Sequence, residues 1–187
     1  MSIPKLSLFS FLLVLSFFIP QNHAFSRSIT KEEMGLKKQH HFTHLHFYWH
    51  DYVKGPNLTA RRIAQSSITD KTPSGFGALV MFDDPLTVGP EKDSKIIGYA
   101  QGMYGFADLK QQGLLMIMNF VFVEGEYNGS TISVLGRNQV MSKVREMGVV
   151  GGSGVFRSAT GYAQAKTITM LDKSGASIVD YNVYVQH

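Results

Sequence analysis

The chain has 187 residues, of which 44% are hydrophobic, and it contains 18 basic residues, 14 acidic residues and no cysteine. This length and composition are typical of a globular protein with one core, and the lack of cysteine excludes a disulfide-stapled scaffold. The basic excess is too small and too dispersed to predict nucleic-acid binding.

Residues 1–24 have the pattern of a secretory signal peptide. Lys5 precedes an almost unbroken apolar run over residues 6–19, and small residues suited to cleavage stand around Ala24. The run is short for a membrane span, although an uncleaved anchor would fit the same residues. We expect cleavage and a secreted mature chain without a membrane span, in which 17 basic and 14 acidic residues leave a net charge near +3.

The next segment, residues 25–41, is polar and lacks a sustained apolar stripe. It predicts a flexible N-terminal arm with at most one helical turn. Beyond it, Asn57 and Asn128 each begin an N-x-S/T sequence. Both are expected to be glycosylated on the secretory route, which requires them to lie in exposed turns.

From residue 42 onward, short runs rich in β-branched and aromatic residues alternate with turn-forming residues. This pattern predicts an all-β domain over residues 42–187, and eight such segments can close an antiparallel β-barrel with room for one small ligand. A β-sandwich would fit the same segments, and the one helical candidate, residues 59–68, is brief and ambiguous. The segments are residues 42–52, 76–84, 95–107, 113–125, 130–138, 144–152, 154–171 and 176–187.

The first segment carries His44, His46 and His50, followed directly by Asp51. On a strand that rises about 3.3 Å per residue, His44 and His50 are roughly 20 Å apart and cannot share a metal ion. The next histidine is the terminal His187, so no second motif supplies further ligands. We predict no metal site and place the three histidines on the strand face that points away from the barrel interior.

Alternation places Phe47, Trp49 and Asp51 together on the opposite face of that segment. If this face lines the barrel, Asp51 is buried, its pKa rises, and it can donate a proton near neutral pH. The alternative is that the strand ends before Asp51, which then caps the following turn.

Two more polar residues in strand-like segments, Tyr104 and Arg145, are candidates to face a cavity. Each also has an ordinary interpretation: Tyr104 as a half-buried strand aromatic, and Arg145 as a partner of Glu146 or a solvated edge charge. Asp83-Asp84-Pro85 could form a carboxylate pair, but the proline favours a turn.

Taken together, these segments resemble the dirigent proteins of plants over residues 42–187. The resemblance rests on six motifs in the right order. They are HFYWHDYVKGPNLTA (46–60), FGALVMFDDPLTVGP (76–90), GYAQGMY (98–104), FVEGEYNGSTISVLGRN (122–138), KVREMGVVGGSGVFRSATGYAQAKT (143–167) and VDYNVYVQH (179–187).

The resemblance implies an eight-stranded antiparallel barrel with a central ligand pocket, a homotrimer, and secretion to the apoplast or cell wall. Family members steer the coupling of two phenoxy radicals that a separate oxidase of the laccase or peroxidase type produces, without a redox cofactor of their own. Some members of the subgroup with THLHFY-HD and GRN-VREM sequences are lyases. One such type, pterocarpan synthase, dehydrates an isoflavanol through a quinone methide.

By motif, the family's pocket acid corresponds to Asp51, its tyrosine to Tyr104 and its arginine to Arg145. Asp51 would protonate a leaving hydroxyl or hydrogen-bond a quinone methide, and Tyr104 would orient the phenol. Arg145 would stabilise a developing phenolate or pair with Asp51 and tune its pKa. Phe47 and Trp49 are expected to line the pocket beside them.

Three positions depart from the family pattern. Asn138, also expected at the pocket, stands where lignan-coupling members often have aspartate, and this removes a possible second acid. Tyr99 and Thr160 stand where arginine is usual. By alternation Tyr99 faces away from Tyr104, so we expect it to affect the surface or a trimer contact rather than the chemistry.

Three functions follow from the sequence. The first is a guide that imposes stereochemistry on radical coupling or on quinone methide cyclisation in phenylpropanoid biosynthesis. The second is a lyase of the pterocarpan synthase type. The third, from another class, is a carbohydrate-binding cell-wall protein, although no lectin segment accompanies the domain.

Overall fold

The computed structural model describes residues 26–36, 41–172 and 175–187. The chain divides into two units, Met1–Leu36 and Lys37–His187. In the described part of the first unit, Thr30 and Glu33 cap one turn reciprocally, since each backbone N–H donates to the other side chain at 2.9 and 3.1 Å. The expected signal peptide lies outside the described residues, and its cleavage stays a prediction.

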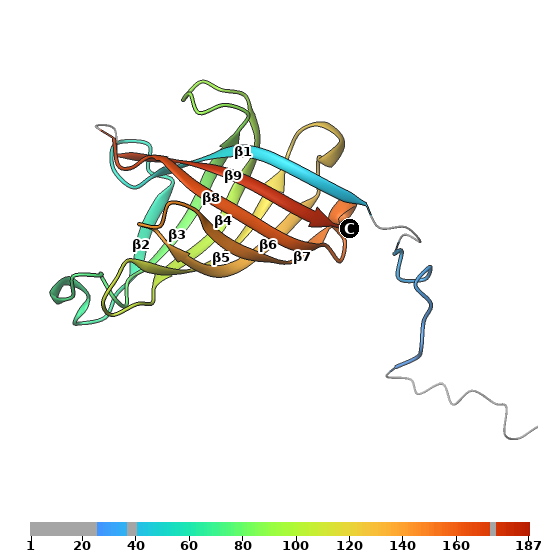
Figure 1. Cartoon of the computed structure of the whole chain (residues 1–187), viewed down its shortest axis with the longest axis horizontal. Coiled ribbons are helices and arrows are strands. Elements are labelled where there is room, and N and C mark those ends of the chain that lie inside the picture. The colour runs from blue at the N-terminus through green and yellow to red at the C-terminus, as the bar shows by residue number, and fades with distance from the viewer. Residues whose placement is uncertain (1–25, 37–40, 173–174) are drawn as a thin grey trace, which may run out of the picture. The chain divides into compact units, whose positions relative to one another are not determined.

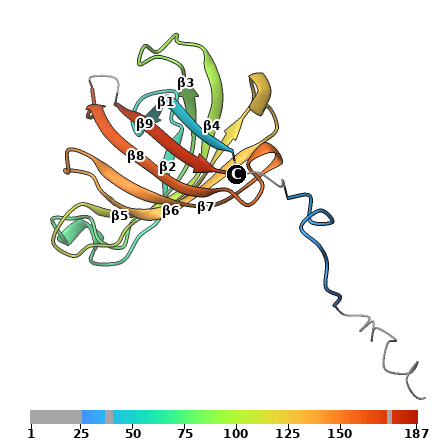
Figure 2. The same cartoon turned by 45° about the vertical axis from the view of Figure 1, so that its right-hand side comes forward.

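The second unit is an antiparallel barrel (Figures 1 and 2). The sheet runs in the order β1-β9-β8-β7-β6-β5-β4-β3, and pairing of β1 with β3 closes it, which confirms the eight-stranded barrel; β2 adds a ninth strand on β3. The strands are β1 Phe42–Tyr52, β2 Ala60–Ala64, β3 Leu79–Thr87, β4 Ile96–Phe106, β5 Gly113–Phe122, β6 Thr131–Gln139, β7 Arg145–Ser153, β8 Thr160–Thr169 and β9 Ala176–Gln186. Between them, the described residues form the 3-10 turns η2 Thr69–Lys71, η3 Gly125–Tyr127 and η4 Gly154–Phe156.

Alternation along each strand fills the barrel interior. On β1, Phe47 and Trp49 point inward and are buried, while on β9 the same holds for Tyr181 and Val183. Gly102 on β4 lets that strand approach β5 closely, because a Cβ there would overlap the carbonyl oxygen of Ile117. Closure leaves no free edge around the ring of eight strands, so the inward side chains form one continuous core.

One end of the barrel is filled with aromatic rings. Phe156 of η4 lies with its ring centroid 5.7 Å from Phe122, 5.0 Å from Tyr127 and 4.9 Å from His187. Phe122 in turn lies 6.3 Å from Phe47, deeper in the barrel. These contacts close that end of the interior with well-packed apolar surface.

Two sequence predictions about local structure are wrong. Residues 59–68, the helical candidate, contain the strand β2 instead, because β3 offers its outer edge to Ala60–Ala64. Asp83-Asp84-Pro85, predicted as a turn, lies within β3. Pro85 is tolerated there because its missing N–H falls on the edge of β3 between the residues paired with β2, up to Phe82, and those paired with β1, from Leu86.

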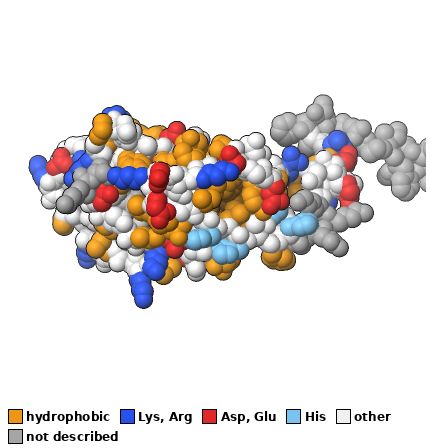
Figure 3. Space-filling model, turned by 90° about the horizontal axis from the view of Figure 1, so that it is seen from above, with side chains coloured by type: hydrophobic (Ala, Val, Ile, Leu, Met, Phe, Trp, Pro, Cys, Tyr) orange, Lys and Arg blue, Asp and Glu red, His pale blue; other side chains and the backbone are white. Residues whose placement is uncertain are grey.

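The outer surface of the barrel is partly apolar. Met81, Met103, Ile117 and Leu135 are neighbours in register across β3, β4, β5 and β6, and three of the four are more than 40% exposed. Histidine side chains lie at the surface on the face shown in Figure 3. Within the described part of the chain, no helix is long and apolar enough to cross a membrane.

Candidate active site

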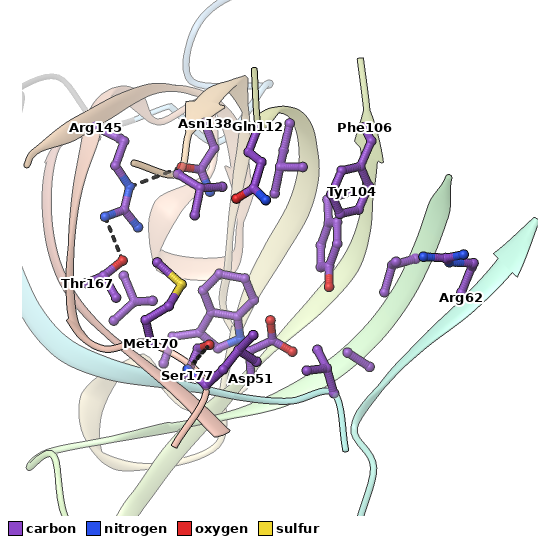
Figure 4. Close-up of a pocket in the computed structure, with 18 of the residues that line it drawn as sticks. Asp51, Arg62, Tyr104, Phe106, Gln112, Asn138, Arg145, Thr167, Met170 and Ser177 are labelled. Carbon is purple, nitrogen blue, oxygen red and sulfur yellow. Dashed lines mark hydrogen bonds between the residues drawn. The ribbon is translucent and has the colours of Figure 1, made fainter. Parts of the chain in front are cut away.

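The end of the barrel opposite the aromatic cluster contains a cavity of about 400 Å³. This volume lies in the usual range of small-molecule sites, roughly 300–1,000 Å³. The cavity is formed where β1, β4, β6 and β8 end and β5, β7 and β9 begin (Figure 4). Its lining residues include Trp49, Asp51, Lys54, Arg62, Tyr104, Phe106, Gln112, Leu114, Asn138, Arg145, Thr167, Met170, Ser177 and Val179.

Two carboxyl groups interact at this end of the barrel: Asp51 on β1 is half-buried and lines the cavity, whereas Asp84 on β3 lies behind the cavity wall. Trp49 pairs with Leu86 across the β1–β3 contact, and the same register continued toward the cavity brings Asp51 opposite Asp84. Asp84 is fully buried and accepts a hydrogen bond of 2.7 Å from the indole N–H of Trp49. The Oδ1 atoms of both carboxyls are buried and have no hydrogen-bond partner in the described part of the protein.

The environment of these carboxyls favours their protonated forms. Burial raises the pKa of Asp51 to about 6, and burial together with the charge of Asp51 raises the pKa of Asp84 to about 8. Two neighbouring buried carboxylates repel each other, so the pair retains one proton at neutral pH. Asp51 faces the cavity while Asp84 lies behind Trp49, so Asp51 is the member of the pair that can reach a ligand.

Tyr104 on β4 brings a phenol to the same side of the cavity. Its ring stacks on Phe82 at 5.7 Å and meets Phe106 edge-on at 6.0 Å, which fixes the direction of the side chain. Figure 4 shows its hydroxyl directed toward the region where Asp51 lies. Burial, with the charges of Asp51 and Asp84, raises the pKa of Tyr104, so this phenol stays protonated and donates a hydrogen bond.

Arg145 on β7 lies across the cavity, beside Asn138 and Thr167 (Figure 4). Its Nε donates to Asn138 Oδ1 at 3.1 Å and its Nη1 donates to Thr167 Oγ1 at 2.8 Å. The side chain is buried, and burial lowers its pKa, yet it forms no ion pair with Asp51 or any other carboxylate in the described residues. A buried cation held only by neutral partners creates a site that favours an anion.

The structure thus brings Asp51, Tyr104, Arg145, Trp49 and Asn138 to one cavity, and it extends β1 through Tyr52, so Asp51 does not cap a turn. Phe47 does not line the cavity. Its ring is buried further down the barrel, 5.0 Å from Phe120 and 6.0 Å from Tyr181, because β1 carries it two residues deeper than Trp49.

The chain is similar to proteins of one plant family. A family model described as dirigent-like protein matches residues 42–186. The chain belongs to the dirigent family. It is 49% identical to pterocarpan synthase 1 of Glycine max, over 86% of each chain, and 45% identical to dirigent protein 21 of Arabidopsis thaliana, over 94% of this chain and 92% of that one. A solved structure of a pterocarpan synthase dirigent protein has a TM-score of 0.74 at 48% identity, covering 81% of this chain and 87% of that chain.

The dirigent barrel also holds a site residue that sequence reasoning missed. The sequence allows Asp84 to belong to a carboxylate pair but favours a turn, because Pro85 follows it. The alternation of Val80, Phe82, Asp84 and Leu86, all buried, was the available signal, since it sets an aspartate on an apolar strand face. Arg62 and Thr167 at the cavity carried no comparable signal, because their positions depend on the closure of the barrel.

Two of the three histidines of β1 lie exposed on the outer face of the barrel, as predicted. His44 bonds Asn182 at 2.9 Å and His46 bonds Asp180 at 2.9 Å, both on the outer surface of β9. His50 also faces away from the barrel interior but is buried, with Nε2 at 2.8 Å from Thr87 Oγ1, because the β3–β4 connection lies near it. In the described residues, no cluster of three or more metal-ligating side chains occurs.

Proposed function

We propose that this dirigent protein is a lyase of the pterocarpan synthase type, which removes water from an isoflavanol and closes a ring through a quinone methide. The observation that carries the proposal is Asp51, a cavity-facing carboxyl whose pKa is raised to about 6 beside a second buried acid. A carboxyl whose pKa is raised toward neutral pH, and which shares one proton with a second buried acid, can act as the general acid that dehydration requires. The similarity to pterocarpan synthase 1 supports the same conclusion.

The reaction balances without an oxidant. Asp51 gives its proton to the benzylic hydroxyl of the substrate, the carbon–oxygen bond breaks, and water leaves as the conjugated phenol loses its proton to solvent water. The quinone methide that results is attacked by a phenol hydroxyl of the pendant ring. That hydroxyl returns its proton to the Asp51 carboxylate, and the conjugated oxygen takes a proton back from solvent water as the ring becomes aromatic again.

Two further side chains act on substrate oxygens in this proposal. Arg145, a buried cation that has no carboxylate partner among the residues the structure describes, stabilises the negative charge that develops on the conjugated phenol oxygen. Tyr104 donates a hydrogen bond that holds the attacking ring in one pose, so that only one face of the quinone methide is reached.

The decisive experiment compares two substrates. Purified protein is incubated with a 4-hydroxyisoflavan in the absence of any oxidant, and separately with a monolignol and a laccase. Conversion of the first to a pterocarpan supports the lyase. If the first incubation gives no pterocarpan and the coupled monolignol product of the second has an enantiomeric excess, the second candidate, a guide for radical coupling, is established instead. The similarity to dirigent protein 21 supports this second candidate.

The cellular setting is part of the proposal. We infer secretion to the apoplast, with glycans on Asn57 and Asn128, both exposed in connections between strands. We also infer a homotrimer that covers the row Met81, Met103, Ile117 and Leu135, because an exposed apolar row across four strands favours burial. Replacing Ile117 by lysine would leave a monomer in light-scattering measurements, whereas a trimer of unchanged stability would refute this interface.

A further inference from the structure

Beneath the cavity, a third buried polar group lies near the two carboxyls. Tyr181 on β9 is fully buried, and its hydroxyl has no hydrogen-bond partner in the described part of the protein. Its ring contacts Trp49 at 5.8 Å and Phe120 at 5.4 Å, so the ring position is fixed by packing. A buried hydroxyl without a partner is costly, and native proteins supply it with ordered water where no side chain is available.

The indole of Trp49 connects the three polar groups. Its N–H binds Asp84, its ring contacts Tyr181, and Asp51 follows two residues later on the same face of β1. Of the five buried side-chain atoms that lack a protein partner among the described residues, three therefore belong to residues that contact this indole or follow it on the same strand face: Asp51 Oδ1, Asp84 Oδ1 and the Tyr181 hydroxyl. Such convergence is expected of a site that holds a small polar guest.

Small side chains lie beside these polar groups. Ala165 pairs with Tyr181 between β8 and β9, and Ala100 pairs with Asp84 between β3 and β4; both alanines are fully buried and face the interior. Arg145 pairs with Ala165 from the other side, so only a methyl group separates Tyr181 from Arg145 along that row. The charged groups that act on the Tyr181 hydroxyl are Arg145, Asp51 and Asp84.

We propose that Tyr181, Asp84 and Asp51 enclose an internal water site through which the proton of the carboxyl pair passes, with Tyr181 as the positioning residue that holds the water. The hydroxyl donates to the water, and the water donates to whichever carboxyl is ionised. Only the use of this proton in catalysis rests on the proposed function, whereas the water site itself does not. Its role is to pass the shared proton from Asp84, the carboxyl with the higher pKa, to Asp51 before a turnover begins.

The test uses Tyr181→Phe in the full mature protein without substrate, so that it stands apart from the lyase assay. The infrared absorption of protonated carboxyl groups is followed from pH 5 to pH 9, and Asp84→Asn assigns the band. Because the water stabilises the ionised carboxyl, its loss is expected to raise the titration midpoint by roughly one pH unit. Tyr162→Phe, on the outer surface of β8, is the matched control and leaves the midpoint unchanged.

Thermal unfolding of the same variant provides the second readout. If the hydroxyl truly lacked a partner, its removal would raise the unfolding temperature. We expect the unfolding temperature to stay the same or fall. An unchanged midpoint or a raised unfolding temperature overturns the proposal. If Tyr181→Phe does not fold, a crystal structure of the wild-type protein decides, and the absence of ordered water within about 3.2 Å of the Tyr181 hydroxyl overturns it equally.

Discussion

The two ends of the barrel interior are filled with side chains of opposite character. At one end, Phe122, Tyr127, Phe156 and His187 bring their rings to centroid distances between 4.9 and 6.1 Å. At the other end, inward positions of β1, β3 and β7 hold two carboxyls and a buried arginine, which form no ion pair within the described part of the chain. Burial of such groups opposes folding, so the apolar end stabilises the barrel that the polar end destabilises.

The largest expected effect comes from removing the proton donor at the polar end. Asp51→Asn keeps the size of the side chain but cannot give up a proton, so turnover of a 4-hydroxyisoflavan should fall at least about 100-fold, as for loss of a general acid. The barrel should unfold at the same or a higher temperature, since a costly carboxyl is gone.

Asp83→Asn is the matched control for this variant. Asp83 is exposed on the outer face of β3, where it accepts a hydrogen bond from Gln101 at 3.1 Å, and its replacement should leave turnover unchanged. Full turnover by Asp51→Asn, measured by chiral chromatography of the product, would remove Asp51 from the reaction.

The aromatic end should respond in the opposite way. Phe156→Ala deletes a fully buried ring and should lower the free energy of unfolding by about 3–5 kcal/mol, while turnover per folded molecule stays the same. Phe42→Ala removes a phenylalanine that is 79% exposed at the same end and should change stability by less than about 0.5 kcal/mol. Equal losses in the two denaturation curves would contradict the role of the ring cluster.

The difference between the two ends also shows which features of the fold and of the site can be predicted from the sequence. The eight barrel strands and the inward direction of Trp49 and Asp51 follow from alternation, which depends only on neighbouring residues. The inward position of Asp84 could not be predicted in this way, because Pro85 locally favours a turn. The pairing of β3 with β4 overrides that preference. The depth of Phe47 and the partners of Arg145 depend on how eight strands close, and no local pattern contains that information.

The pH dependence of stability should reveal the carboxyl pair directly. Asp51 and Asp84 have folded-state pKa values raised to about 6 and about 8, so the folded protein binds more protons than the unfolded chain, and stability falls as pH rises. His50 acts in the opposite sense below about pH 6.5, because burial lowers its pKa. Between pH 6.5 and 8, chemical denaturation should therefore show a loss of stability that Asp84→Asn reduces; the same slope in both proteins would contradict the raised pKa of Asp84.

A smaller effect is expected on the far side of the cavity. Asn138→Asp would give Arg145 an anionic partner at the position that now accepts its Nε hydrogen bond at 3.1 Å. The arginine would become better paired and less available to a phenolate, so turnover should fall roughly tenfold while stability rises. Asn119→Asp, on the outer face of β5 beside Ser133, controls for the added charge. Unchanged turnover in Asn138→Asp would show that the charge of Arg145 does not act on the substrate.

The smallest effect separates the two faces of a single strand. Tyr99 and Tyr104 both belong to β4, but Tyr99 lies at an outward position paired with Pro85 and Val121, whereas Tyr104 is buried at the cavity. Tyr99→Arg, which introduces the residue usual in the family, should change turnover less than about twofold, because an outward side chain does not reach the interior. Tyr104→Phe should lower turnover about tenfold through loss of the hydrogen bond that orients the substrate. If Tyr99→Arg slowed turnover as much as Tyr104→Phe while the protein kept its stability and its oligomeric state, the chemistry would depend on the outer wall of the barrel as well as on its interior.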